Sequence, residues 1–293
     1  MSTLIHLFPG QGSQQRGMGR ELFPRFPRLV EEASAILGYD LAALCLEDDG
    51  QRLGRTEFTQ PALYTVEALG HLARVEDSGR APDFVAGHSL GEYAALFAAE
   101  AFDFATGLRL VQQRGALMGA VSGGGMMAAL GLPLARLRDL LAADPALAEI
   151  DLANQNAPLQ TVLAGPVAAL EAAGRAIEAA GGRAIPLNVR TAFHSRHMAP
   201  VRAAFSAWLD GIAFTPLMLP VIANATALPH RDGEVALRLA AQIDQPVRWV
   251  ESIQYLLDEP DPDFLEIGPG QVLTRLLAEI RKAPVPANIA RRF

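Results

Sequence analysis

The sequence is short of cysteine and of positive charge. Its 293 residues include one cysteine, Cys45, which excludes an internal disulfide and a metal site built from cysteines. Acidic residues outnumber basic ones by 32 to 25, and the net charge of -7 argues against a general nucleic-acid binder. Half of the residues are hydrophobic, so the chain can bury a large core as one domain or two.

Long hydrophobic runs are missing as well. No stretch reaches the roughly 18 uninterrupted apolar residues of a membrane-spanning helix. Residues 1–5 lack the basic region and the long apolar run that begin a signal peptide. We therefore expect a soluble, cytoplasmic protein that associates with neither membranes nor nucleic acid.

The most informative stretch is 83–93, which predicts a short strand, a sharp turn and a helix. Ser89 lies at the turn between Gly87 and Gly91, in the nucleophile-elbow pattern G-x-S-x-G. Glycine on either side removes Cβ atoms that would clash in so tight a reversal. The N–H of Leu90, at the first turn of the helix, lacks an intrahelical partner and can face an oxyanion. We predict a nucleophilic Ser89; a chance match is disfavoured by the flanking strand and helix.

A glycine-rich loop at 9–19 follows a strand predicted at 4–8. It departs from dinucleotide-binding and P-loop patterns, because Gln15 replaces a required glycine and Met18 a required lysine. Its backbone can still supply a second oxyanion donor, for which Gln11 is the best candidate. The alternative is a plain surface loop.

An arginine interrupts an apolar helical stripe. A helix predicted from Asp103 carries Arg114 among apolar residues spaced three and four apart. A guanidinium on a buried face is costly unless it is paired. Its partner is either a structural carboxylate or a substrate carboxylate, which the planar fork of arginine binds through two hydrogen bonds.

A serine nucleophile needs a base, and the chain has six histidines. His194 is favoured because it follows a strand and the bulky Phe193 at the return to the larger domain; His197 is the other candidate in this stretch. No histidine follows the last predicted strand, at 264–267, as it would in an ordinary esterase with this elbow. We therefore predict a Ser–His dyad, with the imidazole oriented by another group such as a backbone carbonyl.

The rhythm of the sequence changes after a glycine-rich joint at 122–125. The next residues predict strand, helix, strand, strand, helix and strand, which is the order of a ferredoxin-like unit. We expect an α/β catalytic domain formed by 1–124 and 191–293, interrupted by a ferredoxin-like subdomain at 125–190.

Seven motifs in order resemble the malonyl-CoA:acyl carrier protein transacylases of fatty acid and polyketide synthesis. They lie at 8–14, 59–62, 87–93, 113–115, 192–195, 246–249 and 266–270. The likeness runs almost end to end and is strongest to freestanding, trans-acting acyltransferases of modular polyketide synthases of the disorazole type. It implies an α/β-hydrolase-like large domain that carries the ferredoxin-like insert.

The resemblance also implies a ping-pong reaction in which malonyl passes from malonyl-CoA to Ser89, and then to the phosphopantetheine thiol of an acyl carrier protein. His194 would act as general base and acid. The backbone N–H groups of Gln11 and Leu90 would form the oxyanion hole, and Arg114 would hold the malonyl carboxylate.

Three more site residues are expected on the same ground. Phe193 would crowd an α-methyl group and disfavour methylmalonyl, and His88 would contact the substrate. The main-chain carbonyl of Gln245 would orient the catalytic histidine. The resemblance implies no metal and no cofactor beyond the substrates, and we expect a monomer.

Carrier proteins are usually acidic, so docking to this acidic chain needs a local basic patch. The candidates lie near His194 and in the C-terminal tail: Arg190, Arg196, Arg202, Arg281, Lys282, Arg291 and Arg292. An ordinary solvated surface is the alternative. A rival function is an editing hydrolase that clears stalled acyl groups from carrier proteins, which typically lacks the arginine found at position 114. A non-catalytic docking protein and a lone esterase are weaker alternatives.

Overall fold

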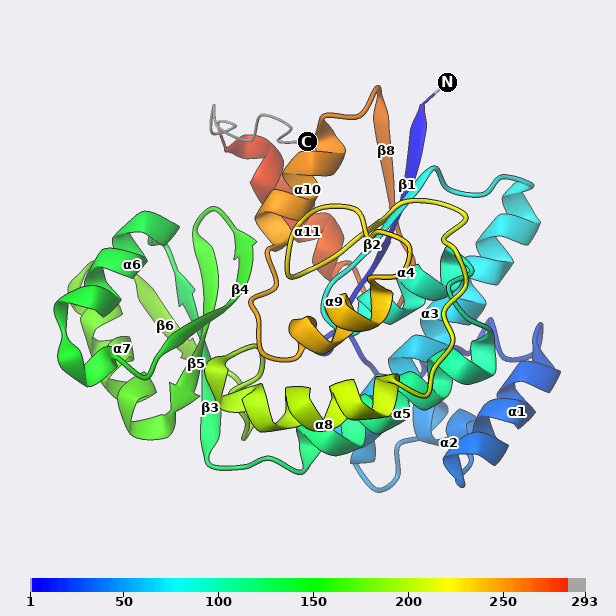
Figure 1. The fold of residues 1–293 in the computed structure, drawn as a ribbon, viewed down its shortest axis with the longest axis horizontal. Coiled ribbons are helices and arrows are strands. Elements are labelled where there is room, and N and C mark those ends of the chain that lie inside the picture. The colour runs from blue at the N-terminus through cyan, green and yellow to red at the C-terminus, as the bar shows by residue number, and fades with distance from the viewer. Residues whose placement is uncertain (1, 284–293) are drawn as a thin grey trace.

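A computed structural model describes residues 2–283, which form two four-stranded sheets (Figure 1). The first sheet is parallel, in the order β7-β2-β1-β8, and its strands are Val221–Ile222, Phe84–Gly87, Thr3–Phe8 and Pro262–Glu266. The second is antiparallel, in the order β4-β5-β3-β6, and its strands are Asp151–Ala157, Gln160–Pro166, Gly124–Leu130 and Arg183–Pro186.

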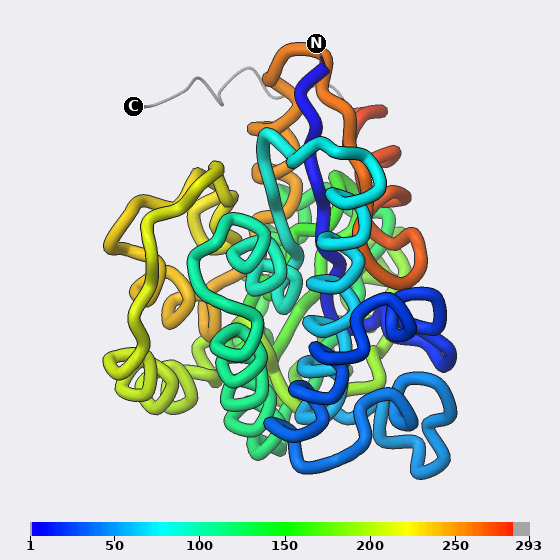
Figure 2. The backbone as a smooth tube through the Cα atoms, turned by 90° about the vertical axis from the view of Figure 1, so that its right-hand side faces the viewer, coloured from blue at the N-terminus to red at the C-terminus, as the bar shows by residue number. Residues whose placement is uncertain are grey.

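Helices cover both faces of the parallel sheet. In Figure 2, α11 (red) and the α4–α5 segment (green) lie on opposite sides of the blue strand β1. The side chains of β1 alternate between the two faces: Ile5 and Leu7 pack toward α10 and α11, while Phe8 joins the core formed with α3, α4 and α5. The helices of this part are α1 (Pro27–Leu37), α2 (Leu41–Leu46), α3 (Thr56–Ser78), α4 (Gly91–Ala98), α5 (Phe104–Gly119), α8 (Ala199–Leu209), α9 (Val235–Gln242), α10 (Trp249–Leu257) and α11 (Val272–Lys282).

The antiparallel sheet has its own core. Helices α6 (Leu134–Ala143) and α7 (Val167–Ala179) pack on one of its faces, and Leu137, Leu163 and Ile177 are fully buried between them. The elements follow the predicted order of strand, helix, strand, strand, helix and strand. A parallel bridge between Asn154 and Val247 ties β4 to the segment before α10 and so connects the antiparallel sheet to the rest of the molecule.

Among residues 2–283, no helix has the length and apolarity to cross a bilayer. The described part of the chain also holds no group of three or more His, Cys, Asp or Glu side chains placed to bind a metal ion. Two residues of the predicted docking patch, Arg291 and Arg292, lie outside the described residues.

A buried histidine pair connects β1 to α3. The Nδ1 atoms of His6 and His71 are 3.3 Å apart, so one ring donates a hydrogen and the other accepts it. The pKa of each imidazole is lowered to about 4, mainly by burial, to which the neighbouring His71 and Arg74 contribute in the case of His6. Both rings are therefore neutral in the folded protein at neutral pH.

We expect this pair to make stability depend on pH. Between about pH 6.5 and pH 4 the unfolded chain binds more protons than the folded protein, so the free energy of unfolding falls as the pH falls. His71→Phe removes one such group from a site already surrounded by the aromatic rings of Phe8 and Phe97. Urea unfolding should show that the free energy of unfolding falls between pH 7 and pH 5 by about 2 kcal/mol less in His71→Phe than in the wild type. An unchanged difference would contradict this account.

Candidate active site

The turn between β2 and α4 has the geometry of a nucleophile elbow. Ser89 adopts a left-handed backbone with φ of 53°. A Cβ added to Gly87 would lie 1.9 Å from the backbone carbon of Gly91, and one added to Gly91 would lie 2.0 Å from the carbonyl oxygen of Phe8. Neither position admits a side chain, so the two glycines of the motif are required by backbone packing.

The structure brings Ser89 and His194 together. The Ser89 Oγ lies 2.7 Å from Nε2 of His194, whose side chain is buried with 3% of its surface exposed. On the other side of the ring, Nδ1 lies 2.8 Å from the carbonyl oxygen of Gln242. A carbonyl only accepts, so Nδ1 carries the hydrogen and Nε2 is free to accept the serine proton.

The prediction that the carbonyl of Gln245 orients the histidine is corrected by the structure, in which Gln242 supplies this carbonyl. The hydrogen bond belongs to Gln242, the last residue of α9, while the backbone of Gln245 has only a smaller influence on the pKa of His194. The last carbonyls of a helix lack intrahelical partners, which makes the end of α9 a natural acceptor. The side chain of Gln245 points instead toward Asp244, at 3.4 Å.

The surroundings keep His194 unprotonated. Burial lowers its pKa most, and the Arg114 charge adds to this; the carbonyl of Gln242 opposes them, and the result is a pKa of about 3. The imidazole is thus neutral across the physiological range, as a general base must be.

Arg114 lies in the wall of the site with neutral partners. Its guanidinium donates to Gln60 Oε1 at 2.8 Å, to Gln242 Oε1 at 3.0 Å and to Ser89 Oγ at 3.1 Å, and it stands 5.4 Å from the ring centre of Tyr93. Its Nε has no partner, and only 1% of the residue is exposed. Within residues 2–283, no carboxylate forms an ion pair with it, so the cation beside the nucleophile remains available to an anionic ligand.

The two predicted oxyanion donors lie at the elbow. The loop bearing Gln11 comes so close that a Cβ on Gly10 would lie 2.4 Å from the carbonyl oxygen of His88. Among the described residues, no hydrogen bond uses the backbone N–H of Gln11 or Leu90, whereas the N–H of Ser89 donates to Asn224. Both N–H groups are thus free to donate to a ligand.

A cavity of about 150 Å³ opens onto these groups. Phe193 lines it, 8% exposed, together with His88, whose Nε2 lies 2.8 Å from Oδ1 of Asn156 on β4. Further lining residues come from the antiparallel sheet: Met126, Asn154 and Val162. The cavity therefore lies between the elbow and the smaller sheet.

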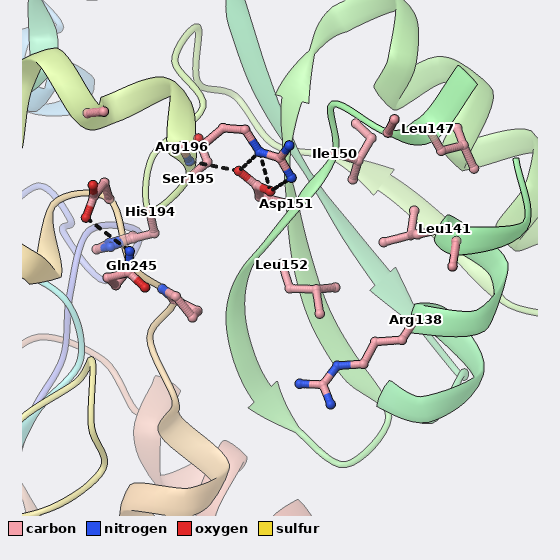
Figure 3. A pocket seen from close by; sticks show the side chains of 15 residues that line it. Arg138, Leu141, Leu147, Ile150, Asp151, Leu152, His194, Ser195, Arg196 and Gln245 are labelled. Carbon is pink, nitrogen blue, oxygen red and sulfur yellow. Dashed lines mark hydrogen bonds and ion pairs between the residues drawn. The ribbon is translucent and has the colours of Figure 1, made fainter. Parts of the chain in front are cut away.

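A larger groove of about 620 Å³ lies on the other side of His194 (Figure 3). One wall comes from α6 and β4, with Arg138 and Leu152, and the opposite wall includes Ser195 and Gln245. Several predicted docking cations near it or on α11 already have partners within residues 2–283: Arg196 with Asp151, Arg202 with Asp244, Lys282 with Glu279, and Arg281 with the ring of Phe264. Arg190 is exposed.

Sequence reasoning did not assign the polar residues behind the dyad. Gln242, Asn224 and Gln60 come from separate parts of the chain and contact the site only through the fold. No element was predicted over α9, which carries Gln242. Glu92 also lies behind the dyad, and its position in the motif at 87–93 was the one feature of the sequence that could have pointed to it.

Comparisons with known proteins identify the family of this chain. The sequence profile of the Acyl transferase domain family matches residues 5–289. The chain is 46% identical over 281 residues to the polyketide biosynthesis malonyl CoA-acyl carrier protein transacylase PksC of Bacillus subtilis, covering 95% of this chain and 97% of that protein. It spans only 37% of PksE of Bacillus subtilis, at 46% identity, and 24% of ThaF of Burkholderia thailandensis, at 53% identity; both are polyketide biosynthesis proteins.

Solved structures are equally similar. A malonyl CoA-acyl carrier protein transacylase from Burkholderia pseudomallei superposes with a TM-score of 0.93 at 45% identity, covering 97% of this chain and all of that one. A type II PKS acyl-carrier protein complex with its malonyl-transacylase gives a TM-score of 0.90 at 38% identity, over 95% of this chain and 93% of that one. From the profile match and these similarities, the chain belongs to the acyl transferase domain family.

Proposed function

We propose that this chain is a malonyl-CoA:acyl carrier protein S-malonyltransferase that acts in trans in polyketide synthesis. The observation that carries the proposal is Arg114, a buried cation without a carboxylate partner, hydrogen-bonded to the nucleophile Ser89. Such a cation beside a reactive serine suits an acyl group that ends in a carboxylate. The functions for which the relatives are named support the same substrate and the carrier-protein acceptor.

The reaction follows from the positions of the donors and acceptors. Nε2 of His194 takes the proton of Ser89 as Oγ attacks the thioester carbonyl of malonyl-CoA. The developing oxyanion accepts hydrogen bonds from the N–H groups of Gln11 and Leu90. The imidazolium then protonates the sulfur of coenzyme A, which leaves, and the phosphopantetheine thiol repeats the sequence in reverse.

The finer architecture is part of the proposal. We assign 1–124 and 191–293 to an α/β-hydrolase-like domain and 125–190 to a ferredoxin-like subdomain. The strand order β4-β5-β3-β6 with both helices on one face supports the second assignment. A monomeric state, a location in the cytoplasm and independence from metal ions or cofactors remain predictions.

The rival reading is an editing hydrolase that uses the same dyad to release acyl groups to water. Loading alone separates the two poorly, because both form an ester on Ser89. Discrimination between a charged and an uncharged acyl group separates them well, because Arg114 lowers the energy of a bound malonyl carboxylate and offers nothing to acetyl.

We therefore expect Arg114→Ala to lower loading from malonyl-CoA by about ten- to a hundredfold, since it removes charge-assisted hydrogen bonds to the carboxylate. Loading from acetyl-CoA should not fall, so the malonyl-to-acetyl ratio should collapse. Intact-protein mass spectrometry of the acyl-enzyme measures both rates. The matched control is Arg109→Ala, an exposed arginine on the same helix.

Two outcomes would count against the transferase. An unchanged ratio in Arg114→Ala would make that arginine a structural residue. A wild-type protein that prefers acetyl, or that passes its acyl group to water faster than to a carrier protein, would favour the editing hydrolase.

A further inference from the structure

A buried carboxylate lies behind the reacting groups. Glu92 is in the first turn of α4, three residues after Ser89, and none of its surface is exposed. Its Oε1 lies 2.7 Å from Nε2 of His230, and its Oε2 accepts hydrogen bonds from the side chain of Gln242 at 2.7 Å and from the backbone of Asn224 at 3.1 Å. A carboxylate held by this many partners is fixed in one orientation.

One of these partners, Gln242, contacts Ser89, Arg114 and His194. Its Nε2 donates to the carbonyl oxygen of Ser89 at 2.8 Å as well as to Glu92. Its Oε1 accepts from Arg114, and its backbone carbonyl holds His194. An amide has one oxygen, and the acceptors at Nε2 together with the donor Arg114 keep that oxygen turned toward the guanidinium. Glu92 is one of those two acceptors.

The second partner, Asn224, holds the elbow itself. Its Oδ1 accepts the backbone N–H of Ser89 at 2.6 Å, and its Nδ2 donates to the carbonyl oxygen of Gly87 at 2.6 Å. These bonds span the left-handed residue at which the nucleophile is presented. The backbone of Asn224 is in turn fixed by Glu92.

We propose that Glu92 is a positioning residue for the acyl transfer, which holds the nucleophile, the arginine fork and the orienting carbonyl in one arrangement through Gln242 and Asn224. This inference rests on the proposed function for the identity of the acyl group. The backbone N–H of Glu92 donates to the carbonyl oxygen of Ser89 at 3.2 Å, but the hydrogen bonds of its carboxylate go to His230, Gln242 and Asn224, so the effect of the carboxylate passes through these neighbours.

The Gln242 amide also lets the Glu92 carboxylate balance the charge of Arg114. Glu92 and Arg114 do not touch, and the Gln242 amide lies between them, bonded to the carboxylate at one end and to the guanidinium at the other. A direct ion pair would occupy the guanidinium fork. The bridged arrangement compensates the buried cation without a direct ion pair, and Nε of Arg114 has no hydrogen-bond partner within residues 2–283.

The test compares two substitutions of Glu92. Glu92→Leu removes both acceptor oxygens, so the Gln242 amide loses one of the two acceptors that hold it and the backbone N–H of Asn224 loses its acceptor. Glu92→Gln keeps one oxygen for Gln242 and Asn224 and directs its NH₂ group to His230, which can accept at Nε2 as a neutral ring. Single-turnover loading of Ser89 from malonyl-CoA and acetyl-CoA is measured for each, together with its reaction with a fluorophosphonate.

We expect Glu92→Leu to slow malonyl loading at saturating substrate at least tenfold and to lower the malonyl-to-acetyl ratio at least threefold, and we expect Glu92→Gln to recover most of both. Glu67→Leu is the matched control: Glu67 is equally buried, but its carboxyl group has no hydrogen-bond partner among residues 2–283. It should leave the ratio unchanged. A purely structural role for Glu92 would change the melting temperature and the folded fraction without changing the ratio.

A double-mutant cycle tests the route through Gln242. Gln242→Leu removes the side-chain amide but keeps the backbone carbonyl that holds His194. If Glu92 acts through that amide, Glu92→Leu should cause little further loss of the malonyl-to-acetyl ratio in the Gln242→Leu background. Additive effects, or a wild-type ratio in folded Glu92→Leu, would overturn the proposal; should that variant not fold, a wild-type rate and ratio in Gln242→Leu would do the same.

The readouts keep this proposal apart from the proposed function. Fluorophosphonate reports the reactivity of Ser89 without any acyl specificity. A wild-type protein that reacts with fluorophosphonate but not with malonyl-CoA would refute the malonyltransferase assignment. In that case a loss of fluorophosphonate reactivity in Glu92→Leu that is recovered in Glu92→Gln would still support the positioning role. A Glu92→Leu variant that reacts with fluorophosphonate as fast as the wild type would refute it.

Discussion

Replacing Ser89 with alanine is expected to abolish the covalent malonyl adduct, lowering the rate of transfer by at least about 10⁴-fold. Oγ is the atom that Nε2 of His194 and Nη2 of Arg114 both contact, and no other hydroxyl in the described part of the chain shares those two contacts. Alanine keeps the turn, because its neighbours are held by Asn224 through backbone atoms. Intact-protein mass spectrometry after incubation with malonyl-CoA detects the adduct directly.

The matched control is Ser195→Ala. Ser195 is a second buried serine, next to His194, but its Oγ donates to the carbonyl oxygen of Ala192 at 2.6 Å and is not bonded to the imidazole. This variant should still form the adduct. A mass increase of one malonyl group on folded Ser89→Ala would show that the nucleophile is another residue.

His194→Ala should slow both half-reactions, acylation by malonyl-CoA and transfer to the carrier protein, by about 10³- to 10⁴-fold. The same Nε2 accepts the serine proton in the first half and the pantetheine thiol proton in the second. Because the pKa of His194 is about 3, the wild-type protein should retain its general base down to pH 4. Rapid-quench measurement of acyl-enzyme formation and decay resolves the two steps.

His197→Ala serves as the control for the histidine. Its Nε2 lies 2.9 Å from the carbonyl oxygen of Glu149, on the exposed side of the same short segment. We expect wild-type rates in both half-reactions. Equal losses in His194→Ala and His197→Ala would mean that the segment as a whole matters and that the dyad is wrong.

Local sequence was sufficient for the elbow. The steric demand that makes Gly87 and Gly91 necessary acts between residues only a few positions apart, so a short pattern contains it. The same holds for the alternation of strand and helix around Ser89. The order of elements in the smaller sheet was also readable, because each helix or strand carries its own period of apolar residues.

The hydrogen-bond partners of the site residues were decided by tertiary structure alone. The sequence left Arg114 with two possible kinds of partner, and the fold gives it the amides of Gln60 and Gln242, which lie on other helices. It also moved the orienting carbonyl from Gln245 to Gln242, because that role depends on where α9 ends. Hydrogen bonds between residues more than a hundred positions apart, such as those of Glu92 to Gln242 and His230, depend on chain packing that no local pattern records.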